Sequence, residues 1–193
     1  MNKNTLKKLL FILISIVLGL LFHRFITIDF IDYFNPCFSF VEYITLLILQ
    51  IVIWYEIIKF FFDKWTTKDK MIIFICYFIV MLIVLLDRPV RNYMDNIIIN
   101  PFNSLSEVFY SLRNIVIATF NIVLFIPLVV LGTLLNSNIK KNMIYASILG
   151  LLIEVIQVIL HRGIFDTADI ILYMIGIIIS KYVYNFLFKK SRN

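Results

Sequence analysis

Long runs of apolar residues, separated by short polar stretches, recur six times along the 193-residue chain. A helix that crosses the hydrocarbon core of a membrane needs about 20 predominantly apolar residues. The pattern therefore predicts an all-α fold, a polytopic membrane bundle of about six transmembrane helices. The predicted segments are 6–22, 40–62, 71–86, 115–135, 143–160 and 167–188.

Two of these segments are less typical than the others. Segment 71–86 spans about 24 Å as a helix, which is short of a hydrocarbon core of about 30 Å, so it must recruit flanking residues or thin the bilayer locally. In segment 6–22 the apolar run follows Lys3, Lys7 and Lys8, as in a signal peptide, but no small-residue cleavage site comes after it. We therefore expect a retained first span and a single membrane domain over residues 1–193.

Composition and charge agree with this class of protein. Apolar residues make up 62% of the chain and charged residues 16%, against about 45 to 50% and about 25% in soluble domains. If the N-terminus is cytoplasmic, every lysine falls on a cytoplasmic segment and the cations outside are all arginines. This positive-inside bias predicts six spans with both termini in the cytoplasm, and it explains the net charge of +6 without a nucleic-acid partner. The outside cations are Arg24, Arg88, Arg91, Arg113 and Arg162.

The longest loop, residues 87–114, lies outside the membrane on this map. Ser104 and Glu107 have the spacing of a capping box and are followed by apolar residues at helical intervals. The pattern predicts a short amphipathic helix at the outer interface. The alternative is that this segment simply continues into the fourth span.

Polar residues are scarce in the first three segments. In the second, Gln50, Glu56 and Lys59 are interpreted as a cytoplasmic end, where Lys59 snorkels and pairs with Glu56 three residues earlier. The last three segments differ, because polar and small residues recur there at steps of three and four and so occupy one face of each helix. These sets are Asn114, Ala118, Asn121 and Phe125; Ser147, Gly150, Glu154, Gln157 and His161; and Asp166, Asp169, Tyr173 and Gly176.

The three polar faces are predicted to face one another, because a polar group turned toward lipid finds no partner. Asn121 and Glu154 each lie eight residues from an outside arginine, so both sit about 12 Å below the outer boundary and can meet with Gln157. An ionisable residue near mid-membrane costs about 2.5–3.5 kcal/mol, which makes Glu154 a candidate functional residue. The alternative is a hydrogen-bonded carboxyl that only fastens helices through Asn121.

Above these residues the sequence predicts an outward-facing polar rim of His161, Arg162, Asp166 and Asp169. Asp166 and Asp169 also have N-cap and N3 spacing at the start of the sixth span, where carboxylates satisfy free amide groups and favour the helix dipole. His161 alone is more typical of an interfacial side chain than of a ligand-binding one. A metal site built from Glu154 and the rim lacks tight His or Cys spacing, so no metal and no cofactor are predicted.

Four short motifs occur in order and at fitting separations in the second half of the chain. They are Asn100-Pro101-Phe102, Asn121-Ile-Val-Leu-Phe125-Ile-Pro127, Glu154-Val-Ile-Gln157, and Arg162-Gly-Ile-Phe-Asp166-Thr-Ala-Asp169 leading to Gly176. With these motifs, the chain from about residue 100 to about 184 resembles the VanZ-like membrane proteins. The resemblance implies a multi-pass protein of the bacterial cell membrane, in a family whose founding member is linked to low-level resistance to teicoplanin and related lipoglycopeptides.

The resemblance also implies which polar positions matter and where this chain departs from the family. Tyr173 stands where the family usually has Asn, and Val129 stands where a glycine is usual. Tyr173 can still donate a hydrogen bond, but it fills more of the predicted pocket. The polar positions that carry over are Asn121, Glu154, Gln157, Arg162, Asp166 and Asp169.

The leading hypothesis is a resistance factor that binds or modifies a lipid-linked envelope component, or the lipid-tailed antibiotic itself. Arg162 suits a phosphate or carboxylate, and in an enzyme Glu154 or Asp166 would act as general base. Whether the protein is an enzyme stays open, because the sequence has no nucleophile arrangement or phosphate loop. The alternative is a non-enzymatic scaffold in envelope assembly, whereas transport fits less well with a single deep ionisable residue. The predicted ligand-binding residues are Asn121, Gln157, His161, Arg162, Asp169 and Tyr173.

Overall fold

The computed structural model describes residues 3–29, 40–86 and 97–189. Six of its helices are long and apolar enough to cross a membrane, so the chain is a multi-pass, all-helical membrane protein and the predicted fold class is confirmed in this respect. The chain falls into two compact units, Met1–Asp87 and Arg88–Asn193, called here the N-terminal and C-terminal units. The candidate spans are Thr5–Thr27, Phe40–Phe62, Thr67–Leu86, Leu112–Asn136, Ile139–Ile159 and Thr167–Phe188.

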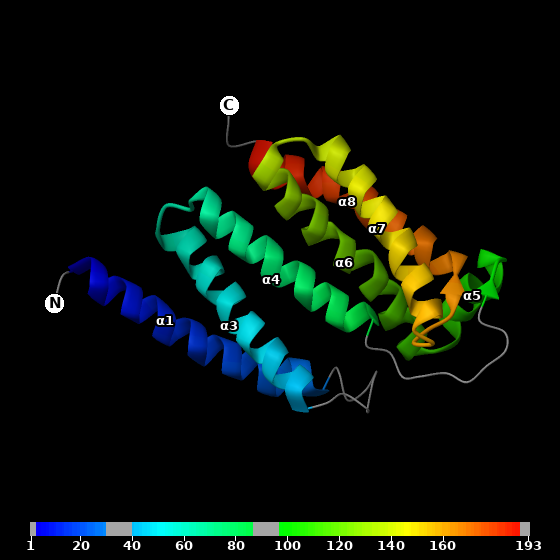
Figure 1. The fold of residues 1–193 in the computed structure, drawn as a ribbon, viewed down its shortest axis with the longest axis horizontal. Coiled ribbons are helices and arrows are strands. Elements are labelled where there is room, and N and C mark those ends of the chain that lie inside the picture. Colours follow the sequence, from blue (N-terminus) through cyan, green and yellow to red (C-terminus); the bar gives the residue numbers. More distant parts are fainter. Residues whose placement is uncertain (1–2, 30–39, 87–96, 190–193) are drawn as a thin grey trace. The chain divides into compact units, whose positions relative to one another are not determined.

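The described part of the N-terminal unit, residues 3–29 and 40–86, consists mainly of three long helices (Figure 1). Helix α3 (Phe40–Phe62) packs against both α1 (Lys3–Phe22) and α4 (Thr67–Leu86). Helix α1 continues into a π-helical turn, His23–Thr27, so the first span extends five residues beyond its predicted end.

Helix α4 begins four residues before the start predicted from hydrophobicity alone. Thr66 and Asp69 form a capping box, in which the Thr66 backbone N donates to Asp69 Oδ2 at 2.7 Å and the Asp69 backbone N donates to Thr66 Oγ1 at 3.4 Å. The resulting 20-residue helix is about 30 Å long, which matches a hydrocarbon core. Local thinning of the bilayer is therefore not required for this span.

The predicted pairing of Lys59 with Glu56 is wrong. Lys59 forms its ion pair with Asp69 across the α3–α4 hairpin, at 2.6 Å, because the first turn of α4 brings that carboxylate directly to the lysine. Glu56 is buried and accepts a hydrogen bond from Trp65 Nε1 at 3.1 Å. A sequence reading that considers one helix at a time cannot see these cross-hairpin partners.

Gln50 does not share the helix end of Glu56 and Lys59 either. Its Oε1 lies 3.1 Å from His23 Nδ1, and its Nε2 donates to Thr27 Oγ1 at 2.7 Å, so it contacts the π-helical turn of α1. His23 and Thr27 are both buried there. A polar residue within an apolar helix thus finds its partners on the neighbouring helix.

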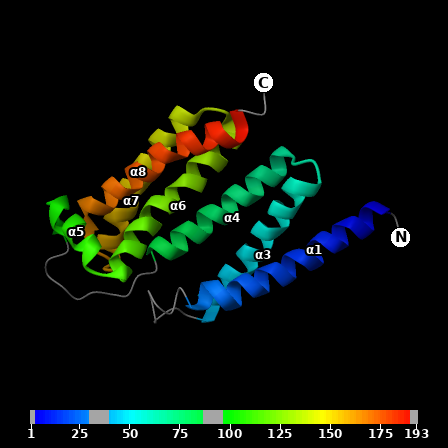
Figure 2. The same ribbon diagram turned by 180° about the vertical axis from the view of Figure 1, so that it is seen from behind.

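Three long helices form the body of the C-terminal unit and run side by side in Figures 1 and 2. Helix α6 (Leu112–Asn136) packs along α8 (Thr167–Tyr184), and α7 (Ile139–Ile159) contacts both. Helix α8 continues into a π-helical turn, Asn185–Lys189. Gly176 permits the close approach of α8 to α6, because a Cβ at this position would overlap the carbonyl oxygen of Ile122.

A short helix, α5 (Pro101–Glu107), precedes α6 and is separate from it, as predicted. Its N-cap is Asn100, whose Oδ1 accepts from the Phe102 backbone N at 3.1 Å, and Pro101 occupies the first helical position. The predicted capping box from Ser104 is therefore wrong. A 3-10 turn, Val108–Tyr110, follows, and Ser111 then caps α6 by accepting from the Asn114 backbone N at 3.1 Å.

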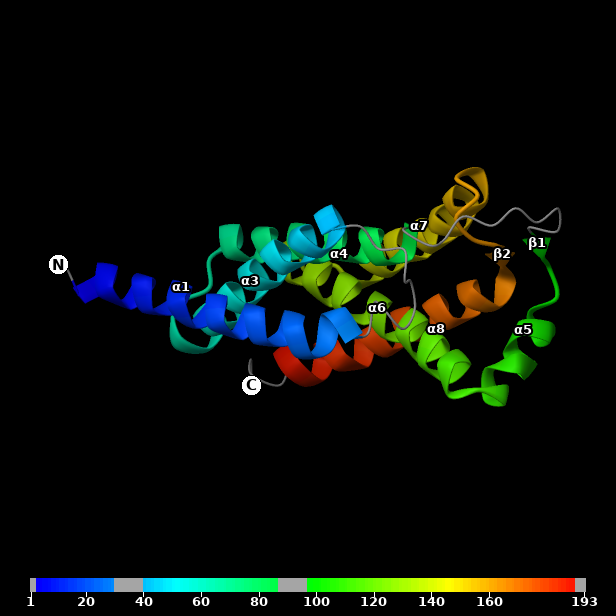
Figure 3. The same cartoon turned by 90° about the horizontal axis from the view of Figure 1, so that it is seen from below.

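Two very short strands tie the segment before α5 to the segment before α8 (Figure 3). Strand β1 (Ile97–Ile98) pairs in parallel with β2 (Phe165–Asp166). Thr167 adds to this link, since its Oγ1 donates to the Ile99 carbonyl oxygen at 2.8 Å. The pairing was not predicted. It fixes Asp166, a residue of the rim, to a strand that is not part of α6, α7 or α8.

Candidate functional site

The loop that carries the rim starts with an abrupt end to α7. His161 has a φ of 53°, in the left-handed region, and its backbone N donates to the Val158 carbonyl oxygen at 3.0 Å. The Arg162 backbone N donates to the Gln157 carbonyl oxygen at 2.9 Å, which completes a Schellman motif. The chain therefore turns immediately after α7 and carries Arg162 into the loop that leads to α8.

Gln157 lies fully buried beneath this loop. A Cβ added at Gly163 would lie 2.9 Å from Gln157 Oε1 and 3.1 Å from Gln157 Cβ. Glycine at position 163 thus lets the loop backbone close over the amide. The Gly that follows Arg162 in the predicted motif therefore has a packing reason.

The N-terminus of α8 is capped as its sequence predicts. Asp166 is the N-cap, with Oδ1 accepting from the Ala168 backbone N at 2.8 Å, and Asp169 occupies the first turn. Both carboxylates are partly exposed. Capping thus accounts for one oxygen of Asp166, while Asp169 has a second contact described below.

Glu154 is the most enclosed ionisable residue of the predicted site. Its side chain is 0% exposed; Oε1 accepts from the Tyr173 hydroxyl at 2.8 Å, and Oε2 accepts from the Asp166 backbone N at 3.2 Å. Both carboxyl oxygens of this α7 residue therefore bond to groups at or near the start of α8. The helix-fastening alternative foresaw such bonds, but through Asn121 and not through Tyr173 and Asp166.

Asn121 connects α6 to α8 at the same end of the bundle. Its Nδ2 donates to Asp169 Oδ1 at 2.7 Å, and its side chain is 2% exposed. Together with the Glu154–Tyr173 bond, this contact shows that the polar faces of α6, α7 and α8 meet, as predicted. Helix α8 is the common partner of the other two.

Tyr173 fits the bundle because a glycine faces it. Its ring stacks on Phe125 with centroids 4.5 Å apart, and a Cβ at Gly150 would lie 3.1 Å from Tyr173 Cδ2. The ring therefore fills the space over Gly150 and brings the hydroxyl to Glu154. This arrangement explains how the bundle accommodates a tyrosine at position 173.

The predicted site residues separate into two layers by exposure. The buried layer has no direct access to solvent, whereas the rim is partly or fully exposed, with His161 the most open. A ligand that approaches from the loop side meets the rim first. The buried layer is Asn121, Glu154, Gln157 and Tyr173, and the rim is His161, Arg162, Asp166 and Asp169.

Within residues 3–29, 40–86 and 97–189, no group of three or more His, Cys, Asp and Glu residues is placed to hold a metal ion. The alternative of a metal bound by Glu154 and the rim carboxylates therefore finds no support in the geometry. The predicted site residues offer hydrogen-bonding groups, the guanidinium of Arg162, the imidazole of His161 and carboxylates.

Sequence reasoning missed the polar contacts that involve residues outside the three predicted faces. Thr167 and the β1–β2 pairing carry the rim segment, yet nothing in a two-residue strand distinguishes it from loop. The His23–Gln50–Thr27 contacts were also missed, although His23 and Thr27 are four residues apart and so share one helix face. That spacing, with a lone Gln in an apolar run, was the available signal.

Comparison with known proteins gives one finding. A family model described as VanZ/LLP1 matches residues 71–188, which is more than half of the chain. The match includes all four motifs and begins upstream of residue 100, within α4. No curated protein and no solved structure matches the chain.

Proposed function

The chain belongs to the VanZ/LLP1 family, and from this premise we propose that it supports low-level resistance to teicoplanin and related lipoglycopeptides in a bacterial cell membrane. The protein binds, or modifies, a lipid-linked envelope component or the lipid-tailed antibiotic itself, and it does so at the rim. The observation that carries this proposal is the meeting of polar faces from α6, α7 and α8 beneath a partly exposed loop.

The rim faces the outside of the cell in this proposal, and both termini are cytoplasmic. The sorting of lysines and arginines along the chain supports this orientation through the positive-inside rule. An outward rim meets envelope intermediates and antibiotics at the surface where both are found.

Arg162 is the first contact for an anionic group of the ligand, because its planar guanidinium can bind a phosphate or a carboxylate through two hydrogen bonds. Asp169 is held by Asn121 and, like Arg162, is a partly exposed residue of the rim. If the protein is an enzyme, Asp166 is the more accessible general base, since Glu154 would first have to release the Tyr173 hydroxyl.

The test is drug susceptibility of cells that express rim variants of the full chain. Arg162→Gln and Asp169→Asn are expected to abolish protection against teicoplanin at unchanged protein levels in the membrane, with no effect on susceptibility to vancomycin. The matched control is Arg113→Gln, an exposed arginine at the start of α6. Retained protection in both rim variants would contradict the proposal.

A non-enzymatic scaffold in envelope assembly is the second candidate. It is favoured by the enclosure of Glu154, whose oxygens both bond within the protein at 0% exposure. A scaffold predicts that Arg162→Gln is silent and that Glu154→Gln reduces resistance only as far as it reduces the amount of folded protein. Plotting resistance against membrane protein level separates the two candidates.

A further inference from the structure

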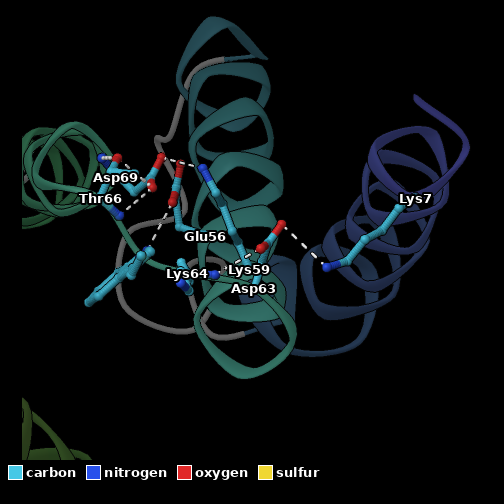
Figure 4. Close-up of polar contacts among 8 residues, drawn as sticks. Lys7, Glu56, Lys59, Asp63, Lys64, Thr66 and Asp69 are labelled. Atoms are coloured by element: carbon cyan, nitrogen blue, oxygen red, sulfur yellow. Dashed lines mark hydrogen bonds and ion pairs between the residues drawn. The ribbon is translucent and has the colours of Figure 1, made fainter. Parts of the chain in front are cut away.

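A second group of charged residues lies at one end of the N-terminal unit, where α1 begins and α3 turns into α4. Figure 4 shows its members drawn from these elements: Lys7 reaches across from α1 to Asp63, while Lys59 and Asp69 meet between α3 and α4. The proposed resistance function uses none of these residues.

The carboxylates of this group are already engaged by neighbouring groups. Asp63 pairs with Lys7 at 3.4 Å and accepts from the Lys64 backbone N at 2.9 Å; these contacts lower the pKa of Asp63, the backbone hydrogen bond most strongly. Asp69 receives Lys59 as well as the hydroxyl and backbone N of Thr66. Each of these two carboxylates is thus paired with one lysine.

Four further lysines at this end remain without a carboxylate. None of them has an ion-pair partner within 4 Å among the described residues, and three of the four are exposed. They come from the start of α1, the α3–α4 turn and the first turns of α4, so three elements contribute to one excess of positive charge. These lysines, called here the basic end, are Lys8, Lys64, Lys68 and Lys70.

The residues beside the basic end are aromatic. Phe61 and Phe62 are 72% and 70% exposed at the end of α3, and Phe60 packs edge-on against Trp65 with centroids 5.1 Å apart. Tryptophan and exposed aromatic rings are typical of the boundary between hydrocarbon and headgroups. The lysines therefore lie at the depth where the phosphates of the lipid are found.

We propose that the basic end binds the phosphate of anionic phospholipids, phosphatidylglycerol being the simplest, in the leaflet that it faces. The charge complementarity is direct, because internal pairs neutralise only Lys7 and Lys59 and leave the basic end for external anions. Each lysine beside an anionic membrane surface increases the affinity of the protein for the anionic lipid on the order of fivefold, and salt screens this attraction. The proposal rests on membrane insertion alone and is independent of the rim's function.

Trp65 provides a reporter at the site itself. The chain has two tryptophans, so a Trp54→Phe variant of the full chain leaves Trp65 as the only indole. The variant is reconstituted into vesicles of phosphatidylcholine mixed with brominated phosphatidylglycerol or with brominated phosphatidylcholine, and quenching of Trp65 emission reports which lipid lies next to it. A several-fold preference for phosphatidylglycerol is expected at low salt, falling toward none at about 1 M salt.

Substitution of exposed lysines assigns the preference to this end. In the same background, Lys64→Gln with Lys68→Gln is expected to remove most of the preference, because each lysine contributes to it. Lys140→Gln with Lys141→Gln, at the start of α7 in the other unit, is the matched control and should leave it unchanged. Unchanged Trp65 emission in pure phosphatidylcholine verifies that the variants fold.

A further arm distinguishes lipid phosphate from free phosphate. Inorganic phosphate, added at constant ionic strength, is expected to leave the preference intact, and its loss would make free phosphate the ligand and overturn the lipid assignment. Equal quenching by both brominated lipids would also overturn the proposal, as would a preference that survives the Lys64 and Lys68 substitutions.

Discussion

Two charged groups, one in each unit of this chain, lie in opposite surroundings: the Lys7–Asp63 pair and Glu154. In the N-terminal unit, Lys7 pairs with Asp63 at a helix end where both side chains are more than 40% exposed. In the C-terminal unit, Glu154 is 0% exposed and bonds to the Tyr173 hydroxyl and a backbone N. Removing a solvent-exposed ion pair changes the free energy of unfolding little, because water hydrates the charges. Removing a hydrogen-bond partner of an enclosed carboxyl costs more, because no water replaces it.

The family match has the same asymmetry. It runs from residue 71 to residue 188, so it includes all of α6, α7 and α8 but leaves out α1 and α3. The part of the chain with the most enclosed polar contacts is therefore the part that the family shares. The first two spans also hold enclosed polar groups, such as Glu56 with Trp65 and Gln50 with His23, but these contacts lie outside the family match.

Gly176 gives the largest expected effect in this comparison. A side chain at this position meets the backbone of α6, which cannot move aside, so Gly176→Val is expected to destabilise the protein by about 3 kcal/mol or to prevent its accumulation. The measurement is the yield and thermal unfolding of the detergent-purified protein. Ile175→Val, at an exposed neighbouring position, is the control and should change little.

Tyr173→Phe comes next. The loss of the hydroxyl removes the donor to Glu154 Oε1 inside the bundle, with an expected cost of about 1–3 kcal/mol. The unfolding temperature should fall by roughly 2–4 °C for each kcal/mol. Tyr182→Phe on the same helix, where the ring is 69% exposed, serves as control, and equal unfolding temperatures for the two variants would show that Glu154 does not depend on this bond.

Asp69→Asn tests a partly buried pair in the N-terminal unit. Asparagine keeps the cap on α4 but loses the charge that faces Lys59, so we expect a cost of about 1 kcal/mol, smaller than that of Tyr173→Phe. A double-mutant cycle with Lys59→Met isolates the pair. A coupling larger than the effect of Tyr173→Phe would reverse the contrast between the units.

Lys7→Gln has the smallest expected effect, a slight fall in unfolding temperature at neutral pH, because the pair is exposed to solvent. The pKa of Asp63 is lowered in the folded protein, so its contribution is present above the ordinary pKa and is lost as the pH falls through the lowered value. Comparing the wild type and the variant between neutral and acidic pH should show their small difference vanishing in acid. A difference that grows on acidification would contradict this sign.

Much of the fold was predictable because each relevant signal is local to one helix. Segment 40–62 coincides with α3, and segment 167–188 with the last span, since apolar length and polar flanks set these limits. The N-cap role of Asp166 followed from the spacing of two acids. The start of α4 was missed because Thr66 and Asp69 extend the helix through capping and not through hydrophobicity.

The sequence by itself determined the class of the protein, its six spans and the face of each late helix that turns inward, because helical periodicity and the exclusion of polar groups from lipid act on every helix separately. Only the tertiary structure decided which polar group meets which. Asn121 forms a hydrogen bond with Asp169, and Glu154 forms one with Tyr173. Lys59 forms its ion pair with Asp69 instead of Glu56. The physical reason is that partner choice depends on how closely two helices approach and in what register, which here is set by glycines such as Gly150 and Gly176.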